Sequence, residues 1–288
     1  MTEKNNDTQF SFVLGSYNRK RFLKAAIKSI RNNGISDPYE IIVVDGGSTD
    51  GSLGWLIKQK DIINIVQHNQ GNFYGKPIKR RSWGYFMNLG FKCAQGKFIV
   101  MTSDDTLLVP GSVMNAFNQY NDLTTQGRNI GAVAFQWREW PQEQEYKVGL
   151  TLGEKIFVNH GMFVRNALED VGWIEEELYQ FYHADGDLCL KLWQKGYEVV
   201  ACPGAFVEHF RHTNSAGRKR HMQEQRSDWS AYLQRWTGIF YDPDADNTGG
   251  WKYCDYKDPY MTVKKFPRVL SYMMIIISAL ERIRRRFT

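Results

Sequence analysis

Apolar runs of four or five residues alternate with amphipathic stretches along the first 125 residues of the chain. The runs predict buried strands at 10–14, at 40–44, near 62–66 and at 98–101. The first intervening helix is predicted from helical spacing and ends before Gly34; its apolar positions are Leu23, Ala26, Ile27 and Ile30. A second helix holds Leu53, Trp55 and Leu56, and a third runs over about 80–94. Strand–helix alternation of this kind predicts βαβ units and a parallel sheet.

The helix around residues 53–56 needs a polar residue at its start. Ser48, Thr49 and Asp50 precede it, and each is a residue type that caps helix N-termini. We expect one of these three side chains to cap the helix.

After residue 130 the pattern loosens. A strand is predicted over 130–135, and a polar stretch follows at 138–147. Short apolar pieces then lie at 156–158 and 162–164, before a helix at about 186–195 and a strand at 199–201. We expect residues 10–125 to form a nucleotide-binding half and residues 126–212 an acceptor half.

Composition places the chain among globular proteins and excludes a diffuse nucleic-acid-binding surface. With 288 residues, 42% hydrophobic and 24% charged, it can bury a sizeable core. The net charge is +6, and residues 264–288 account for all of it, since they hold seven lysines and arginines against Glu281. The preceding residues are balanced, so no nucleic-acid partner is predicted.

The cysteines and the N-terminus predict a reducing, cytoplasmic setting. The four cysteines show neither C-x-x-C pairs nor zinc-site spacing; they are Cys93, Cys189, Cys202 and Cys254. Residues 1–9 are polar and lack the apolar segment of a secretory signal, so we expect a flexible N-terminus.

Three of the predicted strands end in residues suited to binding a nucleotide and a metal ion. Tyr17 follows the first strand, Asp45 ends the second, and Asp104 and Asp105 follow the strand at 98–101. The carboxyl ends of parallel strands meet at the ligand-binding edge of such sheets. Carboxylates there suit Mg²⁺ or Mn²⁺ and, through the ion, phosphates. The alternative is a strand followed by an ordinary Asx turn.

Two common phosphate-binding motifs are absent from the sequence. The Gly75-Lys76 pair lacks the spacing of a P-loop, and the glycines at 46–51 do not form G-x-G-x-x-G. Neither a P-loop nor a Rossmann dinucleotide site is therefore predicted.

Seven short motifs together resemble the inverting glycosyltransferase family 2. They occur in the family's order over roughly residues 10–212, at 12–19, 41–51, 88–99, 103–105, 171–176, 183–188 and 207–209. The resemblance implies a GT-A fold, that is, an α/β protein whose Rossmann-like, mostly parallel sheet is flanked by helices, here with a C-terminal helical extension. It also implies transfer of a sugar from a nucleotide-diphosphate sugar, with uridine favoured as the base, in the presence of Mn²⁺ or Mg²⁺.

The same resemblance implies a role for each residue of the donor site. Tyr17 would stack on the nucleobase and Asp45 would accept a hydrogen bond from it. Asp104 would contact the ribose, and Asp105 would ligate the metal ion. Gly15, beside Tyr17 in the first motif, is also assigned to the donor site.

The chain departs from the family pattern at several positions. Thr102 stands where the family often has a first acid, Gly46 where it often has a second aspartate, and Met87 where it often has an arginine. The negative charge of the phosphates would instead be met by basic residues at the start of the helix predicted over about 80–94, which are Lys79, Arg80 and Arg81. The alternative interpretation of these three residues is a helix start that faces solvent.

On the acceptor side the resemblance points to Asp185 as the general base, although Ala184 replaces the family's glutamate. The alternative is a first-turn acid that favours the helix dipole, and this is the stronger interpretation for Asp187. His209 matches a histidine that reaches the metal ion or the diphosphate, with His212 close enough to compete.

Two further aromatic features are predicted to be structural. For His160 a hydrogen bond in a turn is favoured over contact with the sugar. Trp229 and Trp236 are seven residues apart, which favours the packed face of a helix over a sugar-stacking platform.

The C-terminal region is predicted to follow the catalytic domain as two segments, an acceptor-side loop and helix at 213–262 and a basic amphipathic helix at 263–288. Its apolar run at 269–280 is too short to span a bilayer, which needs about 20 residues. With the adjacent arginines it suits an interfacial helix on an anionic membrane, at the inner face; the alternative is a helix docked on the domain.

The sequence thus predicts a metal-dependent inverting glycosyltransferase. Its acceptor would be a saccharide or a lipid-linked saccharide. Two alternatives stay open, a nucleotidyltransferase of similar fold and a non-catalytic, membrane-associated binding module.

Overall fold

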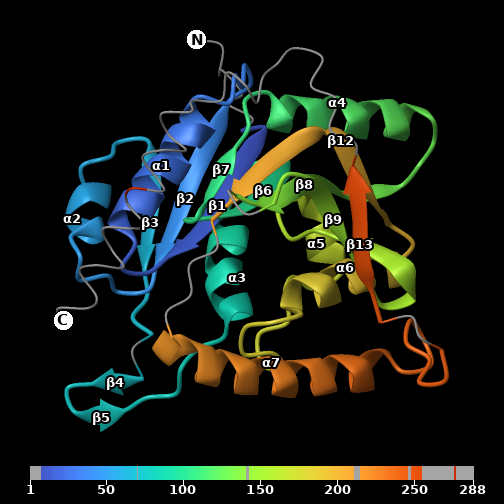
Figure 1. Ribbon diagram of the computed structural model, residues 1–288. Helices are drawn as coiled ribbons and strands as arrows, with labels where there is room; N and C mark the ends of the chain where they lie inside the picture. The colour runs from blue at the N-terminus through green and yellow to red at the C-terminus, as the bar shows by residue number, and fades with distance from the viewer. Residues whose placement is uncertain are drawn as a thin grey trace.

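The structure, a computed structural model, is a mixed sheet with helices packed on both faces (Figure 1). It describes residues 8–69, 71–140, 143–210, 215–245, 248–254 and 276, without the side chains of Phe73 and residues 215–221. The predicted helix at 263–288 and His212 lie outside these residues, apart from Ile276.

The nucleotide half follows the predicted βαβ pattern closely. Its four strands lie parallel in the order β6-β1-β2-β3; they are β1 (Phe10–Ser16), β2 (Tyr39–Asp45), β3 (Ile62–Val66) and β6 (Phe98–Ser103). The helices between them are α1 (Lys20–Arg31), α2 (Ser52–Leu56) and α3 (Trp83–Cys93). A small hairpin of β4 (Asn72–Phe73) and β5 (Lys76–Pro77) projects from the body before α3 (Figure 1).

The acceptor half is largely antiparallel, so the sheet as a whole is mixed rather than mostly parallel. The sheet continues from β6 in the order β11-β8-β9-β10, while β12 pairs with β7 and β8 and β13 pairs with β9. The strands on this side of the sheet are β7 (Thr106–Leu108), β8 (Ile130–Glu139), β9 (Tyr146–Thr151), β10 (Lys155–Phe157), β11 (Gly161–Val164), β12 (Glu198–His209) and β13 (Gly250–Cys254). The cause is the short connections from β8 to β11, because a parallel crossover needs a dozen or more residues.

The remaining helices complete the two outer layers. They are α4 (Ser112–Thr125), α5 (Arg165–Asp170), α6 (Ala184–Gln194) and α7 (Ser215–Trp236), with one 3₁₀ turn, η1, at Leu152–Glu154. In Figure 1, α7 runs along the lower side of the molecule, beneath α3 and α6. None of the helices in the described part of the chain is long and apolar enough to cross a membrane.

The sheet separates two apolar cores, because successive strand residues point to opposite faces. On one face Phe12 and Leu14 pack with the apolar side of α1 and with α2 and α4. On the other, Val13 packs with α3, α5, α6 and the end of α7. Gly96 lets the chain enter β6 beside β1, since a Cβ there would lie 2.7 Å from the backbone of Phe10.

The helix predicted over about 80–94 is confirmed as α3, but it begins only at Trp83, capped by Ser82, because the chain before it forms the β4–β5 hairpin and an extended stretch. One local prediction is wrong. The N-cap of α2 is Gly51, at φ 86°, and not one of the three polar residues before it. Asp50 still accepts a hydrogen bond from the Ser52 N–H, at 3.0 Å, from the position before the cap.

All four cysteines are free, as expected from their spacing.

Candidate active site

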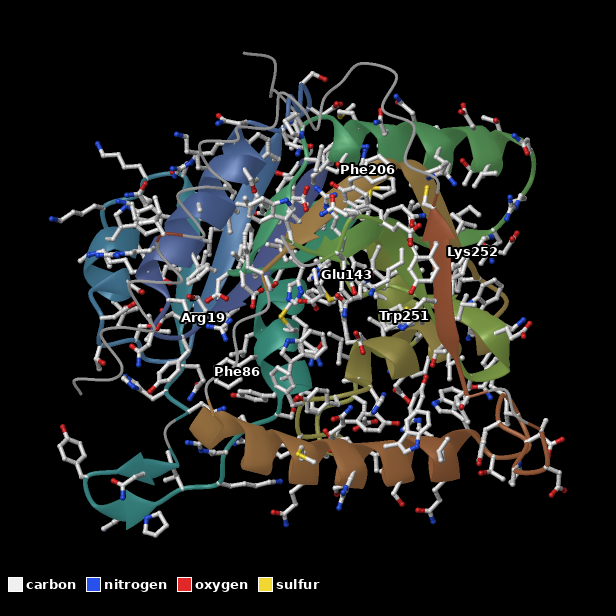
Figure 2. All side chains as sticks on the ribbon, in the orientation of Figure 1. Arg19, Phe86, Glu143, Phe206, Trp251 and Lys252 are labelled. Carbon is white, nitrogen blue, oxygen red and sulfur yellow. The ribbon has the colours of Figure 1, made fainter. Side chains whose placement is uncertain are left out.

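The two adjacent acids at the end of β6 are held together by an arginine. Nη1 of Arg19 lies 3.0 Å from Asp104 Oδ1 and 3.0 Å from Asp105 Oδ2. Arg19 lies just after β1 and is the N-cap residue of α1, so neighbouring parallel strands bring these groups together (Figure 2). Burial raises the pKa of Asp104 to about 6, against the opposing effect of the Arg19 charge.

Asp105 faces a histidine that is itself oriented by an acid. His209 Nε2 lies 3.8 Å from Asp105 Oδ1, and its Nδ1 lies 3.2 Å from Glu139 Oε1. Burial alone would lower the pKa of His209, but the bond to Glu139 and the two negative charges together raise it. The position therefore favours positive charge.

This arrangement fits a divalent cation bound with few protein ligands. Asp105 and His209 would hold the ion, and Glu139 would fix the ring from the outer shell, as carboxylates do for metal-binding histidines. No three His, Cys, Asp or Glu side chains in the described residues are grouped to hold a metal ion. A two-ligand site of this kind suits Mg²⁺ or Mn²⁺, whose shells are completed by phosphate oxygens and water.

Asp45 organises the loop that follows β2. It is completely buried, and its carboxylate accepts hydrogen bonds from the N–H groups of Gly47 and Ser48 and from the Ser48 hydroxyl, at 2.6–2.8 Å. The hydrogen bond that Asp45 would accept from a nucleobase stays a prediction. In the structure its carboxylate shapes the loop on which Tyr17 lies.

Tyr17 is placed as a stacking platform would be. Its side chain is 48% exposed and rests on Gly46, where a Cβ would lie 3.1 Å from Tyr17 Cδ2. Gly46, which stands where the family often has a second acid, therefore leaves room for the aromatic ring. The neighbouring Asn18 joins the two loops, since its Oδ1 accepts from the Thr49 N–H at 2.7 Å.

The other predicted donor residues are less closely grouped. Gly15 lies inside β1 between Val44 and Ser103, and a Cβ at this position would meet no close contact. Arg80 and Arg81 are exposed in the stretch before α3, and neither makes an ion pair with a described residue. Lys79 is paired with Glu177 at 2.7 Å, so its charge is already met.

Asp185 lies in the first turn of α6 with few partners. One oxygen accepts from the Gly186 N–H at 2.9 Å, and the other lies 3.4 Å from Asn159 Nδ2. Burial raises its pKa. The preceding His183 has φ 65° and stacks on Tyr232 at a centroid distance of 5.3 Å, which fixes the entry into the helix.

Asp187, by contrast, is a structural anchor. It is fully buried and binds Tyr179 Oη, Trp236 Nε1 and Arg235 Nε at 2.9–3.0 Å. The expectation that Trp236 packs on a helix face is confirmed, because it is 2% exposed in the core. Trp229 packs beside His183, at 4.9 Å between ring centroids.

A second anchor on α7 holds the loop before α6. The carboxylate of Asp228 accepts hydrogen bonds from the backbone N–H groups of Gln180, Phe181 and Tyr182, each at 2.9 Å. Asp228 is 3% exposed. Asp228 and Asp187 together fix the segment that presents Asp185.

The donor and acceptor sides meet at the loop between β10 and β11. Asn159 contacts Asp185, and the ring of the next residue, His160, lies 5.6 Å from that of His209. The predicted turn hydrogen bond of the His160 ring is wrong, since neither ring nitrogen has a partner among the described residues. Burial, with a contribution from His209, lowers its pKa to about 3.

Sequence reasoning missed Arg19, Glu139, Asn159 and Asp228. Arg19 had a usable signal, since it directly follows Tyr17 and Asn18 in a matched motif at a strand end. The other three act through partners 26–70 residues away, and no local pattern marks them.

Comparison with known proteins agrees with this geometry. Residues 11–168, more than half of the chain, match Glycosyl transferase family 2. A β-1,3-glucosyltransferase of Campylobacter jejuni that acts on GalNAc(5)-diNAcBac-PP-undecaprenol is 30% identical over 115 residues, which are 40% of this chain and 35% of that protein. An uncharacterized glycosyltransferase of Nostoc is 32% identical over 104 residues, 35% of this chain and 30% of its own length. The matches thus span about a third of these relatives.

Solved structures share the fold. A mannosyltransferase of Pyrobaculum calidifontis in complex with GDP-Man and Mn²⁺ superposes with a TM-score of 0.57 at 18% identity, over 78% of this chain and 64% of that one. TarS 1–349 of S. aureus, in complex with UDP-GlcNAc, gives a TM-score of 0.52 at 17% identity, over 78% and 67% of the two chains. The predicted GT-A fold is confirmed, and the family match shows that the chain belongs to glycosyl transferase family 2.

Proposed function

We propose that this protein transfers a sugar from a nucleotide-diphosphate sugar to a hydroxyl group of a saccharide or lipid-linked saccharide, with inversion at the anomeric carbon. The observation that carries the proposal is the placement of Asp185. This lightly bonded carboxylate lies next to Asn159, whose neighbour His160 faces the Asp105–His209 pair. The proposed base, Asp185, and the proposed site of the leaving group, at Asp105 and His209, thus both lie beside the loop between β10 and β11.

The donor would occupy the ends of the parallel strands. Tyr17 offers an exposed ring for the nucleobase, Asp104 a carboxylate for the ribose, and Asp105 with His209 the ligands of a divalent cation. When bound, the cation would neutralise negative charge that develops on the departing diphosphate. The exposed Arg80 and Arg81 stay candidates for further phosphate contacts.

Asp185 would act as the general base. It accepts the proton of the acceptor hydroxyl while that oxygen attacks the anomeric carbon and the bond to the diphosphate breaks. Burial raises its pKa towards neutrality, which increases its strength as a base. In the described conformation the Asn159 amide and the Gly186 N–H orient its two oxygens.

The proposed class of acceptor rests on the name of one relative. The Campylobacter protein is named for an undecaprenol-linked saccharide, and this supports a lipid-linked acceptor.

The test is release of nucleoside diphosphate from UDP- and GDP-sugars with Mn²⁺ or Mg²⁺, using saccharide and polyprenyl-diphosphate-linked acceptors. Asp185→Asn should lower transfer by about 10²- to 10⁴-fold, the usual contribution of a general base. Its nucleotide affinity, measured by calorimetry, should stay within about twofold of the wild type. NMR of the product should show the inverted anomer.

Asp122→Asn, an exposed acid on α4, is the control and should keep full activity. Retained turnover in Asp185→Asn would remove Asp185 as the base. Release of pyrophosphate from a nucleoside triphosphate and a sugar phosphate would instead identify a nucleotidyltransferase. Tight nucleotide binding without any transfer would identify a binding module.

A further inference from the structure

Arg19 has more hydrogen-bonding capacity than its ion pairs use. A guanidinium carries five N–H donors, and Nη1 alone binds both Asp104 and Asp105, at 3.0 Å each. Nε and Nη2 have no hydrogen-bond partner among the described residues. Three donors are therefore left for a ligand, in the planar fork that suits phosphate oxygens.

Arg19 is also the most exposed member of its cluster. Its side chain is 34% exposed, against 4% for Asp104 and 14% for Asp105. The Arg19 side chain is therefore more accessible from solvent than either carboxylate.

The charges of the cluster make such a cation necessary for an anionic ligand. Asp104, Asp105 and Glu139 bring three carboxylates, against Arg19 and the titratable His209. The acids already outnumber these two cations, and without Arg19 the excess of negative charge facing a diphosphate would grow by one.

We propose that Arg19 binds the donor diphosphate directly, in addition to holding the two acids; this rests on the proposed function. The two oxygens of Asp105 face two different cations. Its Oδ2 holds Arg19, and its Oδ1, which also accepts a hydrogen bond from the Ser103 hydroxyl, faces His209 Nε2 at 3.8 Å. Arg19 therefore need not leave Asp105 for a divalent ion to bind on the His209 side, and both positive charges serve one diphosphate.

The experiment uses inorganic pyrophosphate with excess Mg²⁺, which removes dependence on the unknown base and sugar. Calorimetry compares wild type with Arg19→Met. Loss of hydrogen bonds to a charged ligand should weaken pyrophosphate binding by about 10- to 100-fold. Binding of Mn²⁺ alone, measured by EPR, should be unchanged or tighter, because the variant removes a positive charge beside the carboxylates.

Arg31→Met is the matched control. Arg31 is the last residue of α1, whose N-cap is Arg19; it is 32% exposed and is paired with an acid, Asp61, at 2.7 Å. Its variant should bind pyrophosphate within about twofold of the wild type, and circular dichroism should show that all three proteins are folded.

Two results would overturn the inference. Pyrophosphate affinity in Arg19→Met within twofold of the control would show no contact. An equal loss of Mn²⁺ and pyrophosphate binding would show that Arg19 only keeps the acids in place. If wild type binds neither pyrophosphate nor any nucleotide sugar, the proposed function itself fails, and the inference fails with it.

Discussion

The two halves of the molecule hold their functional loops by the same chemistry but from different distances in the sequence. In the nucleotide half Asp45 binds Gly47 and Ser48, the residues two and three positions after it. In the acceptor half Asp228 binds the backbone of residues 180–182, which come 46–48 positions earlier. Each is a buried carboxylate with three hydrogen bonds. The donor loop is therefore built locally, and the acceptor loop depends on a distant helix.

This difference follows the extent of the family match. The match covers residues 11–168 and so contains the donor strands, while α6 and α7 come after it. The strands that would bind the donor lie within the matched residues, and the contacts between α6 and α7 lie beyond them. Under the proposed function, α7 would hold the loop that presents Asp185 and shape the acceptor side.

The largest expected effect comes from breaking the deepest anchor between α6 and α7. Asp187→Ala leaves the Arg235 guanidinium, the Tyr179 hydroxyl and the Trp236 indole without their common acceptor. Leaving these three donors without an acceptor should lower the free energy of unfolding by about 3 kcal/mol. Chemical denaturation followed by circular dichroism measures it.

Asp170→Ala is the comparison for that variant. Asp170 lies on α5 and pairs with Lys195 across 3.4 Å at an exposed position, and such pairs contribute at most about 1 kcal/mol. If both variants lose the same stability, α7 is not anchored through Asp187.

The same contrast explains what the sequence could predict. The strands at 10–16 and 98–103 were found within two residues, because buried parallel strands read as uninterrupted apolar runs. Asp104 and Asp105 were found because they directly follow such a run. Their order along the chain fixes their place at the sheet edge.

Elements with weak patterns escaped prediction. Helix α4 fully buries only Ser112, Val113 and Ala116, and its larger apolar residues, Phe117, Tyr120 and Leu123, are only partly buried against the core. The strand β13 is mostly exposed along its length. Arg19 lay inside a matched motif, yet its pairing with acids 85 and 86 residues later appears only when β1 and β6 become neighbours.

The second prediction compares the removal of each loop anchor, Asp45 in one variant and Asp228 in the other. Asp45→Ala and Asp228→Ala each remove three hydrogen bonds, so each should lower the free energy of unfolding by about 2 kcal/mol. Their functional effects should differ. Asp45→Ala should weaken nucleotide binding about tenfold or more, because the loop beneath Tyr17 loses its shape. Asp228→Ala should leave nucleotide affinity near normal and lower transfer instead.

Calorimetry with UDP and GDP, beside transfer assays, separates the two outcomes. Glu169→Ala, an exposed acid paired with Arg165 within α5, is the control for both. Equal losses of nucleotide affinity in the two variants would mean that α7 supports the donor side as well, and the division between the halves would fall.

The smallest expected effect lies where the halves meet, at His160. Its pKa is about 3 in the folded protein against an ordinary value of 6.5, because the buried ring cannot easily accept a proton. As pH falls, the His160 ring is protonated in the unfolded chain at a higher pH than in the folded protein. The free energy of unfolding is therefore highest above pH 6.5, as far as His160 is concerned, and decreases as pH falls from there towards 3. Between pH 7 and pH 5.5 the loss should be about 1 kcal/mol. Asp104 and His209 have raised pKa values and gain stability over the same pH range, so the contribution of His160 is read from the difference between variants. His160→Gln should lose about 1 kcal/mol less stability than the wild type between pH 7 and pH 5.5, whereas His68→Gln, at an exposed position, should match the wild type. Urea denaturation of the three proteins at both pH values measures the slopes, and parallel curves would show that the His160 ring is accessible to protons in the folded state.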